Sequence, residues 1–302
     1  MNILVTGGTT FVSRYTAEFF VKQGHKVYVL NRGTKPQSDG VCFIKGDRHN
    51  LSSLLSPYKF DVVIDVTAYT GSDVSDLLGG LNQFGQYILI SSSAVYPETL
   101  LPPFRENQPL GENIHWGAYG TNKIKAEEVL LSKVPNAYII RPPYLYGPMN
   151  NLYREAFIFD CAEKDLPVYI PENGDMQLQF YHVLDLCMFI NKLIESRPDE
   201  HIFNVGNSDT ISVREWVIGC YSVVGKTPEF IAVDSAIPAR TYFPFRDYQY
   251  ILDVTKQNAI LPAAIPLEEG LRESYLWYKD HSEEVLKKDY FTVIKEKIVR
   301  TL

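Results

Sequence analysis

Short apolar runs alternate with longer amphipathic runs through the first half of the chain. The short runs are rich in β-branched residues and bounded by turn residues, while the longer runs repeat their apolar positions with helical spacing. This alternation predicts an α/β fold built on a doubly wound parallel sheet, with helices on both of its faces. The expected strands are 3–5, 26–30, 41–45, 61–66, 87–91 and 137–141, and the expected helices are 10–23, 50–56, 73–83 and 118–132.

The alternation loosens after Pro142, where prolines become frequent. We therefore expect residues 1–150 to form the sheet domain and residues 151–302 to form mainly a smaller C-terminal α/β domain that binds the substrate. The segment near 180–206 is expected to return to the first domain. In the second half, the pattern predicts helices at 152–164, 184–196, 213–224 and 267–279 and strands at 168–170 and 202–205.

Paired glycines follow the first expected strand. Gly7 and Gly8 permit a positive φ and a close approach of the backbone to a phosphate. The next helix, which opens with Thr10, Phe11 and Val12, presents free N–H groups and the positive end of its dipole. Strand, glycines and helix in this order predict a Rossmann turn that binds a dinucleotide through these residues, with a purely structural turn as the alternative.

Two further pairs are candidates for cofactor binding. Asn31 and Arg32 end the second expected strand, where an acidic residue would accept hydrogen bonds from the ribose of NAD. A guanidinium suits a 2′-phosphate instead, so we expect NAD(P) with a preference for NADP, although a solvated turn is also consistent. Asp47 and Arg48, after the third strand, are expected to meet the adenine, and Asp47 is equally suited to cap a helix.

Candidate proton-transfer groups lie on an expected helix and beyond a strand. Tyr119 and Lys123 are four residues apart, which places them on one helical face, as in many ordinary exposed pairs. An ammonium beside a phenol favours the phenolate, so we expect a lowered pKa for Tyr119 and a role in proton transfer. The serines at 91–93 follow the fifth strand, at the edge where parallel sheets bind ligands. A serine there can hold a substrate oxygen against Tyr119 or simply form a turn.

Composition and charge narrow the classes of partner. A net charge of −7, with scattered Lys and Arg, gives no basic surface for nucleic acid. No apolar run approaches the length of a membrane span, and a strand begins almost directly after Met1, so we expect no signal peptide and a cytoplasmic location. The four cysteines and six histidines lack ligand spacing, so neither a metal site nor a disulfide is expected.

Taken together and in order, these motifs resemble those of the extended short-chain dehydrogenase/reductases, in particular the nucleotide-sugar epimerase and dehydratase group. The resemblance covers nearly the whole chain. The glycine turn is similar to that family's TGGxxFxG, with Ser13 in place of the last glycine, so slightly relaxed helix–strand packing is expected. Further segments resemble the family's RPxxVYGP, HVxDL, FNVG and DxSK motifs, at 141–148, 182–186, 203–206 and 253–256 respectively.

The resemblance implies roles for particular residues. Ser92, three residues before the Val of a VY pair, would hold the substrate oxygen, and Tyr119 would take its proton as hydride moves to the cofactor. Lys123 would lower the pKa of Tyr119 and bind the ribose of the cofactor. The resemblance also places Ala68, Pro142 and Tyr144 at the cofactor and Ser93, Asn151 and Arg246 at the substrate.

The function implied is that of a homodimeric NAD(P)-dependent epimerase, similar to nucleotide-sugar 4-epimerases, that transfers hydride reversibly at a sugar carbinol. An NADP-dependent carbonyl or keto-sugar reductase is one alternative. Details around Asn31 and Ser92 most resemble an atypical branch that includes the chloroplast stem-loop-binding proteins, so a non-catalytic, RNA-associated or cofactor-sensing protein is another. The arginine that epimerases carry ahead of HVxDL is absent, and Arg240 or Arg246 can supply that charge.

Overall fold

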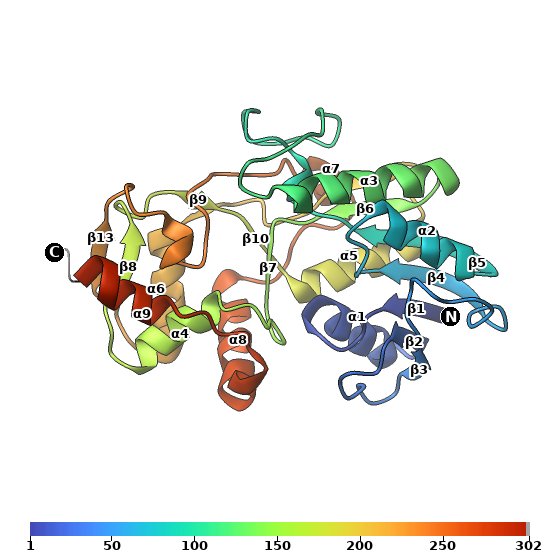
Figure 1. Cartoon of the computed structure of the whole chain (residues 1–302), viewed down its shortest axis with the longest axis horizontal. Coiled ribbons are helices and arrows are strands. Elements are labelled where there is room, and N and C mark those ends of the chain that lie inside the picture. The colour runs from blue at the N-terminus through green and yellow to red at the C-terminus, as the bar shows by residue number, and fades with distance from the viewer. Residues whose placement is uncertain (300–302) are drawn as a thin grey trace.

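Seven parallel strands form the central sheet of the molecule, which the computed structural model describes over residues 1–299 (Figure 1). Their spatial order is β3, β2, β1, β4, β5, β6, β11, so the direction of winding reverses between β1 and β4. The predicted doubly wound sheet is confirmed, and ligands of such sheets bind beyond the carboxyl ends of the strands at this reversal. The strands are β1 (Asn2–Thr6), β2 (Lys26–Asn31), β3 (Cys42–Lys45), β4 (Lys59–Asp65), β5 (Gln83–Ile90), β6 (Tyr138–Arg141) and β11 (Ile202–Asn204).

Alternate residues of the strands face opposite helical layers. Ile3 and Val5 belong to the apolar cluster that includes α1 (Phe11–Lys22) and α5 (Val183–Ser196). Leu4 belongs to the opposite cluster, which includes α2 (Gly71–Gly80) and α3 (Ala118–Lys133). Both faces of the sheet are therefore covered, which fixes α1 and α3 on either side of the strand ends.

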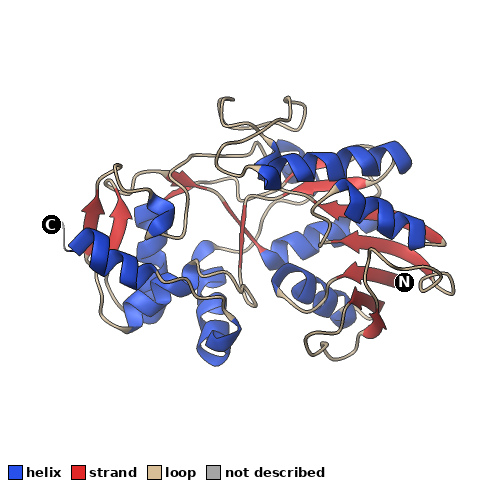
Figure 2. Cartoon of the chain, viewed as in Figure 1, coloured by secondary structure: helices blue, strands red, loops and turns tan. Residues whose placement is uncertain are grey.

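The C-terminal part is built around three helices that pack on one another (Figure 2). They are α4 (Glu155–Glu163), α6 (Val213–Val224) and α8 (Leu267–His281), and β8 (Val168–Pro171) pairs in parallel with β13 (Phe230–Val233) beside them. Pairs β7–β10 and β9–β12 connect this part to the sheet. The remaining strands and α-helices are β7 (Tyr144–Tyr146), β9 (Gln177–Leu178), β10 (Phe180–His182), β12 (Ile211–Ser212), α7 (Thr255–Ile260) and α9 (Tyr290–Val293). The short 3₁₀-helices are η1 (Ser93–Val95), η2 (Ala239–Thr241) and η3 (Ser282–Glu284), and η4 (Ile294–Val299) is a π-helix.

The structure corrects several predicted elements. The helix expected at 50–56 is a series of tight turns, because Ser52 has a φ of +44° that a right-handed helix cannot contain. The helix expected at 73–83 begins earlier, where Thr70 and Asp73 form a capping box, and it ends at Gly80, so that Gln83 starts β5 instead. Strands β7, β10 and β13 were not predicted, because three- and four-residue runs carry little periodicity.

No helix within residues 1–299 is long and apolar enough to span a lipid bilayer. The expected C-terminal range of 151–302 ends outside the described part of the chain, at residues 300–302. Within the described part, α5 packs on α1 and β11 pairs with β6, so residues from both halves of the sequence complete the sheet layers.

Candidate active site

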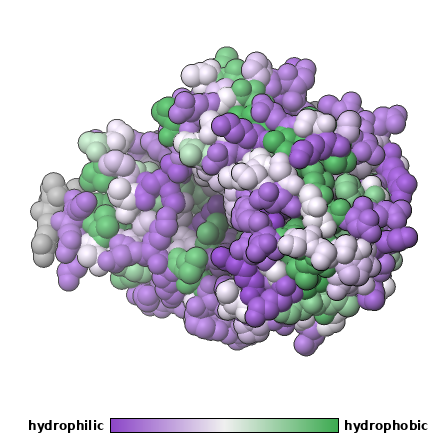
Figure 3. Space-filling model, turned by 45° about the vertical axis from the view of Figure 1, so that its right-hand side comes forward, coloured by the Kyte–Doolittle hydropathy of each residue, from purple (hydrophilic) through white to green (hydrophobic). Residues whose placement is uncertain are grey.

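A cavity of about 580 Å³ opens beyond the carboxyl ends of β1, β4 and β5. Its wall combines residues from the start of α1, from the β5 end and from α3 with residues of the C-terminal part. The space-filling view shows the surface hollowed near the centre of the visible face (Figure 3). The lining includes Thr10, Phe11, Val12, Ser92, Ser93, Tyr119, Lys123, Pro142, Tyr144, Asn151 and Arg246, all of which the sequence analysis had assigned to the cofactor or the substrate.

The glycine turn leaves the start of α1 open to an anion. Gly7 and Gly8 have φ angles of +89° and +83°. An added Cβ at Gly7 would lie 2.8 Å from Ser13 Oγ, and one at Gly8 would lie 2.5 Å from a methyl of Val29, so neither position accommodates a side chain. The N-cap residue Thr10 makes no side-chain cap, so backbone N–H groups of the first turn are left for a phosphate. The turn therefore fits the pyrophosphate of a dinucleotide.

Asn31 and Arg32 differ in their surroundings at the end of β2. Asn31 Nδ2 donates to Gly7 O at 2.6 Å, and its Oδ1 accepts from Gly33 N at 2.9 Å, so Asn31 braces the glycine turn. Arg32 is exposed, and no partner for its guanidinium is found within residues 1–299. Lys35, whose Nζ donates to Thr10 Oγ1 at 3.3 Å, was missed in the sequence and places a second cation beside the turn.

Asp47 and Arg48 make contacts within the protein. Asp47 is exposed, and its Oδ1 accepts from His49 N at 3.0 Å, as expected of a turn-capping carboxylate. Arg48 Nη2 lies 2.7 Å from Asp65 Oδ2, a carboxylate that has no exposed surface. Thr6 and Tyr87 also donate to Asp65, so Arg48 neutralises a buried acid and only its remaining N–H groups are left for a cofactor. Ala68, also predicted to contact the cofactor, is fully buried outside the cavity lining.

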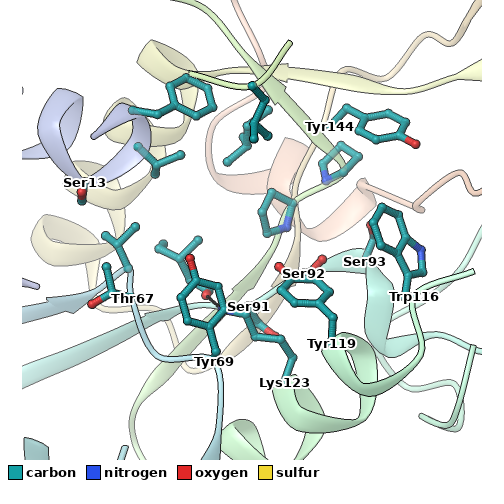
Figure 4. A pocket seen from close by; sticks show the side chains of 18 of the residues that line it. Ser13, Thr67, Tyr69, Ser91, Ser92, Ser93, Trp116, Tyr119, Lys123 and Tyr144 are labelled. Carbon is teal, nitrogen blue, oxygen red and sulfur yellow. Dashed lines mark hydrogen bonds between the residues drawn. The ribbon is translucent and has the colours of Figure 1, made fainter. Parts of the chain in front are cut away.

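Tyr119 and Ser92 lie side by side in the cavity (Figure 4). Tyr119 as a whole is 37% exposed, although its phenol reaches into the cavity wall. Burial raises the pKa of this phenol, and a hydrogen bond with Ser92 opposes the rise. The lowered pKa that we expected for Tyr119 is therefore wrong for this structure.

Lys123 explains why the pKa of Tyr119 is not lowered. Its Nζ donates to Ala68 O at 2.7 Å and to Ile90 O at 2.9 Å, and it lies 5.0 Å from the centre of the Tyr69 ring. Burial lowers the pKa of Lys123 to about 8, and Asp65 and Glu127 oppose that effect. The ammonium is thus held by two backbone carbonyls against the Tyr69 ring, and the influences on the pKa of Tyr119 are burial, Ser92, Tyr69 and Arg154.

The far side of the cavity is basic. Arg154 and Arg246 line it, and each guanidinium lies 4.7 Å from the centre of an aromatic ring, that of Tyr144 and that of Trp116 respectively. Burial and then Arg240 lower the pKa of Arg246, while burial and the three arginines lower the pKa of Lys288. We call Arg154, Arg240, Arg246 and Lys288 the basic cluster. None of them forms a salt bridge with an acid in the described part of the chain.

Several lining residues were missed in the sequence. They are Thr67, Tyr69, Trp116, Arg154 and Tyr250. Trp116 stands three residues before Tyr119, and Arg154 stands three residues after Asn151, so a search for aromatic and cationic neighbours of the candidates would have found both. Conversely, Gly7, Gly8, Asn31, Arg32, Asp47, Arg48 and Ala68 do not line this cavity.

Known proteins share this chain's sequence and fold. It is 30% identical over 299 residues to the chloroplast stem-loop binding protein of 41 kDa b from Arabidopsis thaliana, covering 90% of this chain and 78% of that protein. It is 25% identical over 338 residues to the UDP-glucose 4-epimerase of Halalkalibacterium halodurans, covering 93% and 96% of the two chains. In fold it is similar to the dTDP-glucose 4,6-dehydratase of Bacillus anthracis, solved in complex with NAD, with a TM-score of 0.77, 19% identity and 94% and 98% coverage.

The family model described as the NAD dependent epimerase/dehydratase family matches residues 3–78 and 74–206. These two segments contain the glycine turn, Ser92, Tyr119 and Lys123. The family assignment, the Rossmann sheet and the cavity at the strand ends agree with one another. By sequence, fold and site, the chain belongs to the NAD dependent epimerase/dehydratase family.

Proposed function

We propose that this protein transfers hydride reversibly at a carbinol of a nucleotide-linked sugar, as a 4-epimerase does. The observation that carries the proposal is that one cavity joins the open start of α1, the Ser92–Tyr119 pair, and Arg154 and Arg246 of the basic cluster. A dinucleotide on the glycine turn would reach the first two, and an anionic substrate held by the basic cluster would meet it there. An NADP-dependent keto-sugar reductase would use the same residues.

Each residue of the site has a distinct part in this reaction. Ser92 holds the substrate oxygen, and Tyr119 exchanges a proton with that oxygen. Burial raises the pKa of Tyr119 further above its ordinary value, so the phenol stays protonated at neutral pH and suits the return of a proton to a carbonyl oxygen. A bound nicotinamide supplies the hydride acceptor and donor. Lys123, held by Ala68 and Ile90, provides a cation for the hydroxyls of the cofactor ribose.

The basic cluster supports a substrate that carries a diphosphate. Arg154 and Arg246 face the cavity, and Arg240 and Lys288 add to the potential behind them. Neighbouring positive charges repel one another, which lowers their pKa values. A bound anion would relieve this repulsion and stabilise the cluster. A neutral sugar or a simple ketone would not neutralise this positive charge, whereas a nucleoside diphosphate would. The cluster therefore favours a substrate that carries a diphosphate.

Elimination of water is not part of the proposed reaction. Dehydratases that resemble this chain carry an Asp-Glu pair directly after the catalytic Ser or Thr, and Ser93 and Ala94 occupy those positions here. Ser93 is buried and Ala94 has no exposed surface. Neither side chain moves a proton near neutral pH, so reversible hydride transfer is the remaining chemistry.

The experiment that tests the proposal incubates the protein with NAD or NADP and a panel of nucleotide sugars, followed by mass spectrometry and NMR. An epimer has unchanged mass, and a ketone or a reduced sugar differs by two hydrogens. A product lighter by one water would overturn the hydride-transfer assignment. The absence of any product across the panel, with cofactor bound, would overturn the enzymatic proposal.

We further propose that NADP binds more tightly than NAD and that the protein forms a homodimer. Arg32 and Lys35 are two cations near the glycine turn, where an acid that would hold the ribose diol of NAD is lacking. The dimer rests on the family resemblance alone. Light scattering coupled to size exclusion measures it directly.

A second candidate is a non-catalytic role in RNA binding, favoured by the 30% identity to a chloroplast stem-loop binding protein. The net charge of −7 weighs against it, because affinity for RNA is dominated by neutralisation of phosphates. Titration of the protein with a stem-loop RNA at two salt concentrations distinguishes the two candidates. Micromolar or tighter binding in about 0.15 M salt, together with no turnover, would favour the RNA role.

A further inference from the structure

A buried ion pair lies behind the cavity and joins the helix that carries Tyr119 to the sheet. Glu127 and Arg141 are each 2% exposed. Arg141 Nη2 lies 2.5 Å from Glu127 Oε2 and Arg141 Nε lies 3.0 Å from Glu127 Oε1, so the two groups meet as a fork. Neither residue lines the cavity, so neither is placed to touch a substrate.

The pair connects three elements of the site at one point. Tyr119, Lys123 and Glu127 are spaced four residues apart on α3, so they share one helical face. Arg141 ends β6, and Ser91, which precedes Ser92, donates a hydrogen bond to Glu127. Figure 4 shows Ser91 beside Lys123 and Ser92 at the floor of the cavity.

Arg141 extends this connection away from the cavity. Its Nη1 donates to the Tyr96 hydroxyl at 2.8 Å and to Glu106 O at 3.3 Å. The Tyr96 hydroxyl in turn donates to Asn204 Oδ1 at 2.7 Å, on strand β11. The pair is thus anchored in a buried network on its far side, and among the members of that network named here Glu127 is the one that belongs to α3.

The first half of α3 is held by Lys123, which donates to Ala68 O and Ile90 O, and by Gly120, which packs closely on Ala94 O. Gly117 stands at its N-cap with no side-chain cap, and the fully buried apolar residues of α3, Ala126 and Leu130, lie at or beyond its middle. Apolar contacts tolerate small sliding movements, whereas a bidentate guanidinium–carboxylate contact fixes distance and angle. A buried ion pair also adds little net stability compared with well-packed apolar residues, so stability alone does not account for it.

We propose that the Glu127–Arg141 pair is a positioning device, which sets α3 so that Tyr119 and Lys123 meet Ser92 in reacting geometry. The inference rests on the proposed function of those three residues. Glu127 and Arg141 act through α3 and are positioning residues, not catalytic ones.

Glu127 also contributes to the charge state of Lys123. The groups that face Lys123 are Asp65 from β4, Asp73 from α2, Arg48 from the loop after β3, and Glu127 from α3 itself. The Tyr69 ring covers it from the cavity side. Asp65 and then Glu127 are the largest influences that keep the ammonium protonated against burial. Loss of the Glu127 charge is therefore expected to shift the titration of Lys123 to lower pH.

The test compares Glu127→Gln, Arg141→Met and the double variant with wild type. Each single variant leaves one buried charge unpaired, so its melting temperature falls, whereas the double variant recovers most of that loss. If the pair positions α3, kcat in the double variant stays about tenfold to a hundredfold below wild type, with a smaller change in KM. Glu128→Gln, on the exposed face of the same helix, is the matched control and leaves each of these quantities unchanged.

A second measurement needs no turnover. The Lys123 titration is followed by NMR of ¹³C-labelled lysine, with Lys123→Arg to assign the signal. In Glu127→Gln and in the double variant, the midpoint moves to lower pH by about half a unit or more. A double variant that recovers both stability and full kcat, with an unmoved Lys123 midpoint, would overturn the inference. If the proposed function is wrong, the wild-type protein itself shows no turnover. In that case the midpoint of the Lys123 titration in the variants still tests the inference.

Discussion

The sheet end and the far end of the cavity hold charge in different ways. At the sheet end, Arg48 is paired with Asp65, and Lys123 donates to two backbone carbonyls. At the far end, Arg154 and Arg246 lie against aromatic rings, and no acid in the described chain pairs with them. Arg48 and Lys123 at the sheet end therefore have protein partners before any ligand arrives, whereas the arginines of the far end are left with excess positive charge.

Under the proposed function, this difference predicts which part of the ligand each end would bind. The sheet end offers backbone N–H groups at a fixed turn, so its shape is set by glycine geometry and tolerates little change. The far end offers side-chain charge, which under the proposed function would favour an anionic substrate and which can be altered one residue at a time. Substitutions at the two ends should therefore affect different steps of the reaction.

The largest effect is expected where the two ends meet, at Tyr119. Tyr119→Phe removes the proton-transfer hydroxyl and keeps the ring, so turnover should fall by about two to four orders of magnitude with NAD(P) affinity unchanged. Steady-state kinetics and calorimetry measure the two quantities. Activity equal to wild type would remove Tyr119 from the mechanism.

His182, at the end of β10, is expected to make stability depend on pH. It has no exposed surface, and burial lowers its pKa to about 4, so it is neutral at pH 7 despite lying 3.6 Å from Glu273. Between pH 6.5 and 4 the unfolded chain binds a proton that the native state excludes. The free energy of unfolding should therefore fall as pH is lowered, by up to about 3 kcal/mol, and this contribution is fully present above pH 6.5.

Urea unfolding from pH 4 to 7 checks this expectation. His182→Gln should flatten the pH dependence, and His281→Gln, at a more exposed position, serves as the control. Identical slopes for wild type and His182→Gln would contradict it.

Substitutions in the basic cluster are expected to change the affinity for the substrate without changing the affinity for the cofactor. Arg154→Ala or Arg246→Ala should weaken the binding of a nucleoside diphosphate about tenfold to a hundredfold, the scale of a hydrogen bond to a charged group. NADP affinity should be unchanged. Arg272→Ala, which removes an exposed cation of α8, is the matched control for calorimetry. Equal losses in NADP affinity would mean that the two ends are not independent.

The smallest expected effect concerns cofactor choice at Arg32. NADP should bind about tenfold more tightly than NAD, the scale of one exposed charge-assisted contact, and Arg32→Ala should abolish the difference. Lys22→Ala, an exposed cation at the end of α1, should leave it intact. Equal affinities in the wild type would show that Arg32 only faces solvent.

The sequence by itself determined the sheet and the turn. The alternation of short apolar runs with amphipathic ones predicts parallel strands and covering helices, and paired glycines directly after the first apolar run predict the turn. The spacing of four between Tyr119 and Lys123 is likewise a local property of a helix. These features depend on neighbours within a few residues, so a one-dimensional pattern is sufficient to find them.

Only the tertiary structure decided how charge is distributed around the cavity. The sequence predicts that Arg48 contacts the cofactor, but in the structure Arg48 forms an ion pair with Asp65, seventeen residues away. Arg154 and Arg246 meet at one cavity wall from segments far apart in the chain. The pKa of Tyr119 rises where a lowered value was expected, because the fold buries the phenol and holds the Lys123 ammonium against two backbone carbonyls. Burial and electrostatic interaction depend on distances in space, and residue spacing along the chain does not encode those distances.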